Sequence, residues 1–172
     1  AKPDPIVAKL GPAARIIGAT LHNTANPTML EAGYKANVIP QPASAVVDGR
    51  FLPGLEDELL STIQSLIGDK VRMETVIRDK ALETSFDGPM VDAMCKALIA
   101  EDPDAIPVPY CMSGGTDNKA LADLGIRGFG FSPLKLPPDL DFSALFHGVD
   151  ERVPVDALLF GTRVLDHFLR NC

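Results

Sequence analysis

The sequence has 172 residues, 46% of them hydrophobic and 23% charged, a composition that can bury a sizeable core and is not typical of a disordered chain. Its formal net charge of -7 and its lack of long Lys or Arg runs argue against a nucleic-acid or anionic-membrane partner. No apolar stretch reaches the roughly 18 residues that span a bilayer, and no secretion signal is visible. The spacing of Cys95, Cys111 and Cys172 fits no disulfide framework. We therefore expect a reduced, cytoplasmic protein.

The first predicted element is a helix over residues 5–21, in which apolar residues recur at helical spacing. Gly11 and Pro12 interrupt the pattern, so we expect one broken helix or two short ones. Residues 29–38 are expected to be extended. Residues 43–52 then alternate between two faces, as a β-strand does.

An amphipathic helix is predicted over residues 55–67, where leucines and isoleucines recur at helical intervals and acidic residues fill the first turn. Gly68 is expected to end this helix. Residues 71–78 alternate as a further strand. The order in the first half of the chain is therefore helix, strand, strand, helix, strand, which predicts an α+β sandwich that lacks its first strand.

The second half changes character, and its boundary with the first is predicted near residues 80–88. Helices alternate here with short apolar strands, in the order helix 89–100, strand 108–112, helix 116–124, strand 126–131 and helix 154–169. A Pro-rich loop at residues 132–148 precedes the last helix. This alternation predicts a parallel or mixed α/β layer.

Arg50 is the first candidate functional residue, because it lies on a predicted strand rich in apolar residues, after the segment Asn37-Val38-Ile39-Pro40. A guanidinium in such a place needs a partner, and a carboxylate is its best bidentate match. The alternative is an edge-strand arginine that pairs with a neighbouring Asp or Glu. The residues alone leave both interpretations open.

The segment Ser113-Gly114-Gly115-Thr116 lies between a predicted strand and a predicted helix. Thr116 can cap the helix with its hydroxyl, and the glycines let a ligand approach the backbone. Free N–H groups at a helix start attract anions. The alternative is a plain turn between strand and helix.

His147 lies in the loop before the last helix and is followed by carboxylates, including Glu151. This arrangement fits a metal ligand with a supporting carboxylate, and the alternative is a surface histidine. His167 is explained as a favourable charge near a helix C-terminus, and His22 is left structural. The sequence has no nucleotide-binding glycine motif, no G-x-S-x-G elbow and no paired zinc histidines.

The segments that carry these residues form an ordered set, namely Asn26-Pro27-Thr28, Gly33 to Pro40, Asp48 to Gly54, Ser113 to Asp117, and His147 to Pro154. In this order and at these spacings the set resembles the dinuclear-zinc peptidase family that includes aminoacylases, glutamate carboxypeptidase, carnosine-type dipeptidases and succinyl-diaminopimelate desuccinylase. The resemblance covers nearly the whole chain. It favours the functional interpretation of each segment over the local one.

The resemblance implies an α/β fold with two parts. Residues 1–84 would form an α+β lid and dimerisation domain, with an antiparallel sheet, two helices and its first strand missing. Residues 85–172 would form the C-terminal part of a mixed α/β catalytic domain. Asn37 and Arg50 match lid residues that reach the substrate, commonly its carboxylate and often in the partner subunit's site.

In the second part, the resemblance implies that Ser113, Gly114, Gly115 and Thr116 form a substrate-binding loop. His147 matches the last metal ligand of the family, and Glu151 would support it without binding the metal. The other metal ligands and the catalytic carboxylates of the family have no counterpart in this chain and are expected upstream of it. One histidine cannot hold two zinc ions, since each zinc needs about four ligands.

We therefore expect the C-terminal part of a zinc-dependent hydrolase that cleaves amide bonds of N-acyl amino acids or dipeptides and binds the substrate carboxylate. The intact site would hold two zinc ions, whereas this chain alone would bind zinc weakly or not at all and be inactive. A homodimer is expected. The alternatives are a non-catalytic dimerisation module and a metal-independent hydrolase built on Ser113.

Overall fold

The computed structural model describes residues 5–172 and divides into two units. One unit is Ala19–Leu82, and the other combines the described residues up to Gly18 with Glu83–Cys172. The division near residues 82 and 83 lies within the predicted boundary region. The identification of the two parts as lid and catalytic domains stays a prediction, and the structure differs from the predicted bounds in grouping the first helical segment with the second part.

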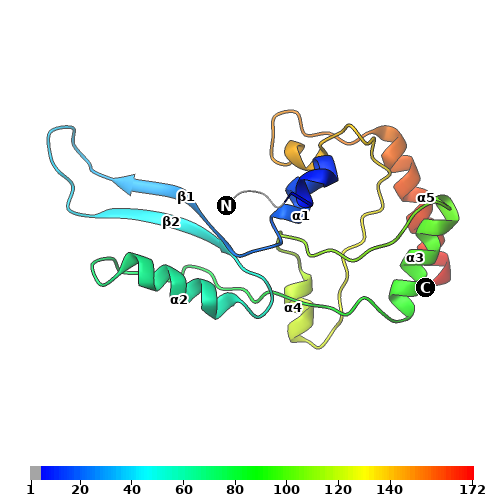
Figure 1. The fold of residues 1–172 in the computed structure, drawn as a ribbon, viewed down its shortest axis with the longest axis horizontal. Coiled ribbons are helices and arrows are strands. Elements are labelled where there is room, and N and C mark those ends of the chain that lie inside the picture. The colour runs from blue at the N-terminus through cyan, green and yellow to red at the C-terminus, as the bar shows by residue number, and fades with distance from the viewer. Residues whose placement is uncertain (1–4) are drawn as a thin grey trace. The chain divides into compact units, whose positions relative to one another are not determined.

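The smaller unit, Ala19–Leu82, is a β-hairpin followed by a helix (Figure 1). Strand β1 (Thr24–Ala32) pairs antiparallel with β2 (Ala43–Arg50), and α2 (Glu56–Ile67) follows. The register shifts between Pro27 and Met29, where the proline has no N–H to donate to the ladder. The predicted extended segment therefore begins earlier than expected, at Thr24, and ends at Ala32.

The larger unit contains most of the helices, and Figure 1 shows them along the chain in order of colour. They are η1 (Val7–Ala13), α1 (Ala14–Gly18), α3 (Pro89–Glu101), α4 (Asn118–Asp123), η2 (Phe142–Leu145) and α5 (Val155–Asn171). η1 and α1 correspond to the predicted broken helix, and the break lies at Gly11, whose φ is 56°. Glycine adopts this left-handed backbone without steric cost.

The core of the larger unit lies where α3 packs on α5. Both helices place small and apolar residues on the contacting face, namely Val91, Met94 and Ala97 from α3 and Ala157, Phe160, Gly161 and Val164 from α5. Phe131 and Phe168 pack beside this core edge to face, with ring centroids 5.6 Å apart. Three- and four-residue spacing along both helices explains why the sequence pattern located them correctly.

Gly161 allows α5 to approach the segment after Phe131 closely. A Cβ at this position would lie 2.6 Å from the carbonyl oxygen of Pro133, a backbone atom that cannot rotate away. Gly161→Ala is therefore expected to destabilise the chain by about 1–3 kcal/mol, although alanine is the better helix former. Denaturant unfolding measures the change. Gly130→Ala is the control, because nothing lies within 4 Å of its added Cβ, and an equal loss there would contradict the steric explanation.

The fold class predicted from the sequence, α/β, is confirmed, since helices occur together with a two-stranded antiparallel sheet. The strands predicted at 71–78, 108–112 and 126–131 are wrong, because the structure is irregular in these segments. Alternating or apolar residues provide the faces of a strand, but its N–H and C=O groups also need a neighbouring strand. β1 and β2 are the only strands among the described residues.

Many large apolar side chains remain exposed, including Leu30 (83%), Ile39 (92%) and Val76 (81%). Large apolar side chains are usually buried in a folded domain, so this exposure is high. In the part of the chain that the structure describes, no helix combines the length and the apolar character needed to cross a bilayer.

Candidate functional site

Asn37 and Arg50, the two predicted substrate-binding residues of the smaller unit, lie at opposite ends of the hairpin. Arg50 ends β2 and is opposite Thr24, whereas Asn37 lies in the connection that follows Ala32. At ~3.3 Å per residue, the length of β2 separates the two ends by about 20 Å. The structure therefore does not bring Asn37 and Arg50 of one hairpin to the same point, and Figure 1 shows how far the hairpin extends.

Arg50 pairs with a neighbour on its own strand. Its Nε donates to Oδ2 of Asp48 at 2.7 Å, and the two side chains remain 46% and 43% exposed. The structure thus contains the ion pair with a neighbouring Asp that was the alternative interpretation of Arg50. The ion pair does not exclude a ligand, because the Arg50 side chain remains 46% exposed to solvent. The pair instead restricts the orientation of the guanidinium plane.

The end of the hairpin that carries Arg50 is held in place by Asn23. The Asn23 side chain donates from Nδ2 to the Leu55 carbonyl at 3.0 Å and accepts from the Leu52 N–H at 2.9 Å. These bonds join the start of β1 to the turn between β2 and α2. A site at Arg50 therefore has a supported backbone around it.

The segment Ser113 to Thr116 is exposed and precedes a short helix. The helix, α4, begins only at Asn118, and Thr116 contributes its carbonyl to Lys119 N rather than a hydroxyl cap. The expected cap by the Thr116 side chain is therefore wrong. Because α4 has six residues, its dipole also gives little attraction for an anion.

His147 lies in a tight turn after η2 and has a φ of 61°, which is uncommon for a residue other than glycine. Its backbone N–H donates to Oε2 of Glu151 at 3.2 Å. The N–H of Gly148 donates to the Leu145 carbonyl at 3.0 Å. Glu151 thus contacts the backbone of His147, and the His147 residue is exposed. The role of Glu151 as a support for a metal-binding imidazole stays a prediction.

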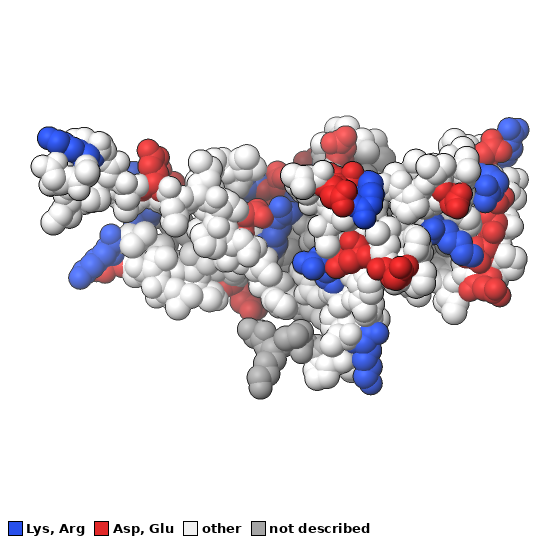
Figure 2. Space-filling model, turned by 90° about the horizontal axis from the view of Figure 1, so that it is seen from above, with Lys and Arg blue, Asp and Glu red and all other residues white. Residues whose placement is uncertain are grey.

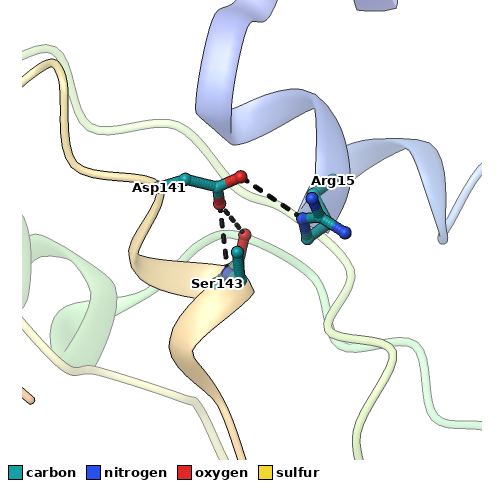
Figure 3. Close-up of polar contacts among 4 residues, drawn as sticks. Arg15, Asp141 and Ser143 are labelled. Carbon is teal, nitrogen blue, oxygen red and sulfur yellow. Dashed lines mark hydrogen bonds and ion pairs between the residues drawn. The ribbon is translucent and has the colours of Figure 1, made fainter. Parts of the chain in front are cut away.

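Asp141 begins η2 and gathers three donors around its carboxylate, as Figure 3 shows. Ser143 Oγ donates to Oδ1 at 2.9 Å, the Ala144 N–H donates to Oδ1 at 3.1 Å, and Arg15 Nε donates to Oδ2 at 3.4 Å. The hydrogen bond from Ser143 is the main reason that the pKa of Asp141 lies below its usual value of 3.8, and Ala144 and Arg15 lower it further against the effect of burial.

The sign of this pKa shift gives a testable prediction. Because the pKa is lowered on folding, ionised Asp141 stabilises the folded chain above pH 3.8, and this contribution is lost as the pH falls through the folded-state pKa. We expect Ser143→Ala to raise the pKa of Asp141, because it removes the largest single cause of the lowered value. An NMR titration of the Asp141 carboxyl carbon measures the change, and an unchanged pKa would contradict the assignment of Ser143 as the main cause.

The described residues do not form a complete metal site. Over residues 5–172, no three His, Cys, Asp or Glu side chains gather closely enough to hold a metal ion. His147 fits the donor chemistry of a single ligand, with an imidazole suited to zinc and a carboxylate fixed beside its backbone. Among the residues that the structure describes, His147 is therefore a residue that could contribute one imidazole to a metal site.

The charged surface of the described residues is mixed in sign. On the face in Figure 2, basic and acidic side chains lie beside one another, without a broad basic field. Several of them form ion pairs, such as Arg163 with Glu101 and Lys135 with Asp102. This distribution agrees with the net charge of -7 and gives no support to nucleic-acid binding.

Arg15 and Asp141 are not among the residues that the sequence motifs nominate. Asp141 has a weak local signal, since Asp is one of the residues preferred at a helix N-cap. Arg15 has none, because its contact with Asp141 spans 126 residues of sequence. Pairs of this kind become visible only when the fold is known.

Comparison with known proteins places this chain among peptidases. The profile of the peptidase family M20/M25/M40 matches residues 7–171. The chain is 28% identical to a probable carboxypeptidase S-like 2 of Dictyostelium discoideum, over 88% of the chain and 30% of that protein. It is 30% identical to an N-fatty-acyl-amino acid synthase/hydrolase of Mus musculus, over 97% of the chain and 34% of that protein.

A third relative is aminoacylase-1 of Homo sapiens, which is 29% identical over 84% of the chain and 35% of that protein. No solved structure matches the chain significantly. The chain spans about a third of the length of the curated relatives that it matches. Since the family profile covers nearly all of its residues, the chain belongs to the peptidase family M20/M25/M40.

Proposed function

We propose that this chain is the C-terminal part of a metal-dependent hydrolase that cleaves the amide bond of N-acyl amino acids or dipeptides. The observation that carries the proposal is Arg50, an exposed guanidinium whose orientation Asp48 restricts, in a chain of this peptidase family. The relatives named as an aminoacylase and as a hydrolase of N-fatty-acyl amino acids support an acylated amino acid as substrate. Both substrate types carry a free carboxylate.

Arg50 would bind that carboxylate. A planar guanidinium matches a carboxylate in geometry and charge, and two parallel N–H donors fix the position of the substrate as well as its affinity. Asp48 would hold the guanidinium plane through Nε, which leaves less side-chain freedom to be lost on binding. The overall negative charge makes such a local cation necessary for an anionic substrate.

Asn37 would serve the substrate of another subunit. It lies about 20 Å from Arg50 along the hairpin, too far for both residues to bind one carboxylate. In a homodimer the tip of one hairpin could reach the site of its partner. The open edges of the two-stranded sheet and the exposed Met29 and Leu30 support pairing of this unit with a second copy. Light scattering tests the dimer.

In the larger unit, Ser113, Gly114, Gly115 and Thr116 would form a substrate loop, because the segment is exposed and its glycines allow close approach to the backbone. His147 would bind one metal ion through its imidazole, and Glu151 would hold the backbone of that residue. The two zinc ions of the intact site would polarise the substrate carbonyl and supply hydroxide. Their remaining ligands would come from outside this chain.

Substrate pairs test the proposal on the intact enzyme. We expect hydrolysis of N-acyl amino acids, and a loss of most of kcat/KM when the carboxylate is replaced by a carboxamide, because Arg50 then faces a neutral group. Chelation of the metal should abolish turnover. Equal rates on acid and carboxamide would refute carboxylate recognition, and turnover that resists chelators would favour a metal-independent hydrolase built on Ser113.

A non-catalytic dimerisation module is the second candidate. The observation that favours it is that the described residues hold no complete metal site, so this chain needs other residues for catalysis. The two candidates differ in one result. An intact protein that forms dimers but hydrolyses none of the N-acyl amino acids or dipeptides would support the module and refute the enzyme.

A further inference from the structure

We propose that Arg15 and Asp141 are a positioning pair that holds the loop bearing His147 against the N-terminal helical segment. The proposal rests on the role of His147 as a metal ligand in the proposed function. It adds two residues that touch neither metal nor substrate and that act through the loop. Its support is a continuous series of contacts that runs from α1 to Glu151.

The first contacts fix the start of the loop. Asp141 is the N-cap residue of η2, and its Oδ1 accepts from Ser143 Oγ and from the Ala144 N–H. The Ala144 N–H also donates to the backbone carbonyl of Asp141 at 3.1 Å, so the carboxylate reinforces a turn that the backbone already closes. The carboxylate thereby helps to fix the direction in which η2 leaves Asp141.

The next contacts transmit that direction to His147. Phe142 and Phe146 pack edge to face across η2, with centroids 5.2 Å apart. The turn that follows is closed by the bond from Gly148 N to the Leu145 carbonyl and by the bond from His147 N to Glu151. With only one residue between η2 and His147, a change at the start of η2 moves the imidazole.

Arg15 connects this local structure to a distant part of the chain. Its Nε donates to Oδ2 of Asp141, on the side of the carboxylate that η2 does not use (Figure 3). Both η1 and α1 contact η2 directly. The cap alone would leave η2 and its loop free to move as a body, whereas the arginine ties them to α1. Asp141 therefore caps η2, and its contact with Arg15 positions η2 relative to α1.

The test uses His147 as the reporter and the other two histidines of the chain, His22 and His167, as internal references. In the metal-free 172-residue chain labelled with ¹⁵N at the imidazoles, Arg15→Ala and Asp141→Ala are expected to shift the His147 ring signals and leave those of His22 and His167 in place. Hydrogen exchange of the Gly148 amide should accelerate about tenfold in both variants, and that of Ala144 mainly in Asp141→Ala. The double variant should show little further change.

The matched control is Arg163→Ala, which removes another interhelical ion pair of the same unit, with Nε 2.8 Å from Glu101 Oε2. It should leave the His147 signals unchanged. Asp141→Asn keeps a capping acceptor and loses the charge, so it should protect Ala144 while shifting His147 as Arg15→Ala does. This variant keeps the test decisive if Asp141→Ala unfolds the loop.

Unchanged His147 signals in both Arg15→Ala and Asp141→Asn would overturn the proposal. A shift of all three histidines together would do so as well, since it would show general loosening. These measurements need no metal and no substrate. A negative result would therefore refute the positioning pair without bearing on the proposed hydrolase activity. A His147 that is not a metal ligand would instead be revealed by unchanged zinc binding in His147→Ala of the intact enzyme.

Discussion

Arg50→Ala in the intact enzyme is expected to lower kcat/KM for an N-acyl amino acid about a hundredfold. Removal of one partner of a desolvated charge pair costs several kcal/mol, and the partial exposure of Arg50 sets the expectation at the lower end of that range. The effect should fall mainly on KM, because the carboxylate is bound equally in the ground state and in the transition state. Steady-state kinetics on the purified variant measures both parameters.

The chain provides a closely matched control for this substitution. Arg72 pairs with Glu74, two residues away, with its Nε 3.1 Å from Oε1, and both side chains are exposed. Arg72→Ala removes a charge and an ion pair of the same kind in the same unit and should leave kcat/KM nearly unchanged. Near-normal kinetics of Arg50→Ala, or equal losses in both variants, would contradict carboxylate binding by Arg50.

Phe160→Ala is expected to lower the free energy of unfolding by about 3–5 kcal/mol, which is a large part of the stability of a domain. Phe160 is 6% exposed and packs with Ala97 and Val164, which are fully buried. Its removal leaves a cavity between α3 and α5 that neither helix can fill without losing other contacts. Denaturant unfolding followed by circular dichroism measures the loss.

Leu159→Ala is the control for Phe160, since it lies next to it on α5 and is 54% exposed. This substitution removes apolar volume from the same helix without opening a cavity, so a loss below about 1 kcal/mol is expected. Equal losses for the two variants would show that buried Phe160 contributes no more to stability than an exposed leucine of the same helix. The packing of α3 on α5 would then not be the core of this unit.

The helices were predictable because their information is local. α2, α3 and α5 each repeat apolar residues at helical spacing, and Pro89 and Gly68 mark a start and an end. The hairpin was predictable in part, since β2 was located well, whereas β1 lies at Thr24–Ala32 rather than at the predicted residues 29–38. Local periodicity therefore accounts for most of the elements that the structure contains.

The strands predicted at 71–78, 108–112 and 126–131 failed for a physical reason. A strand is completed by hydrogen bonds to another segment, and the sequence of one segment carries no information on whether that partner is present. Arg78 illustrates the outcome, since it reaches α2 and pairs with Glu56 at 2.6 Å from an irregular segment. Residues 71–78 alternate and residues 108–112 are apolar, but neither segment has a partner strand among the described residues.

The candidate site divides in the same way. Sequence motifs nominated Arg50 and His147 as candidates, and their roles stay predictions. The contact between the His147 backbone and Glu151 follows from a tight turn of a few residues. Pairing of Arg50 with a neighbouring carboxylate, here Asp48, was one of the two interpretations that the residues left open. The separation of Asn37 from Arg50 and the contact between Arg15 and Asp141 depend on tertiary structure, which residue spacing does not determine.

The zinc content of this purified chain, measured by elemental analysis together with hydrolysis of a panel of N-acyl amino acids, tests the central claim most directly. The claim is that the chain carries carboxylate recognition and one metal ligand of a site completed by other residues. It predicts little bound zinc and no turnover, because no three potential ligands gather within the described residues. Two tightly bound zinc ions per chain with turnover would contradict it and would place the complete set of metal ligands within this chain, among its Asp, Glu and Cys side chains.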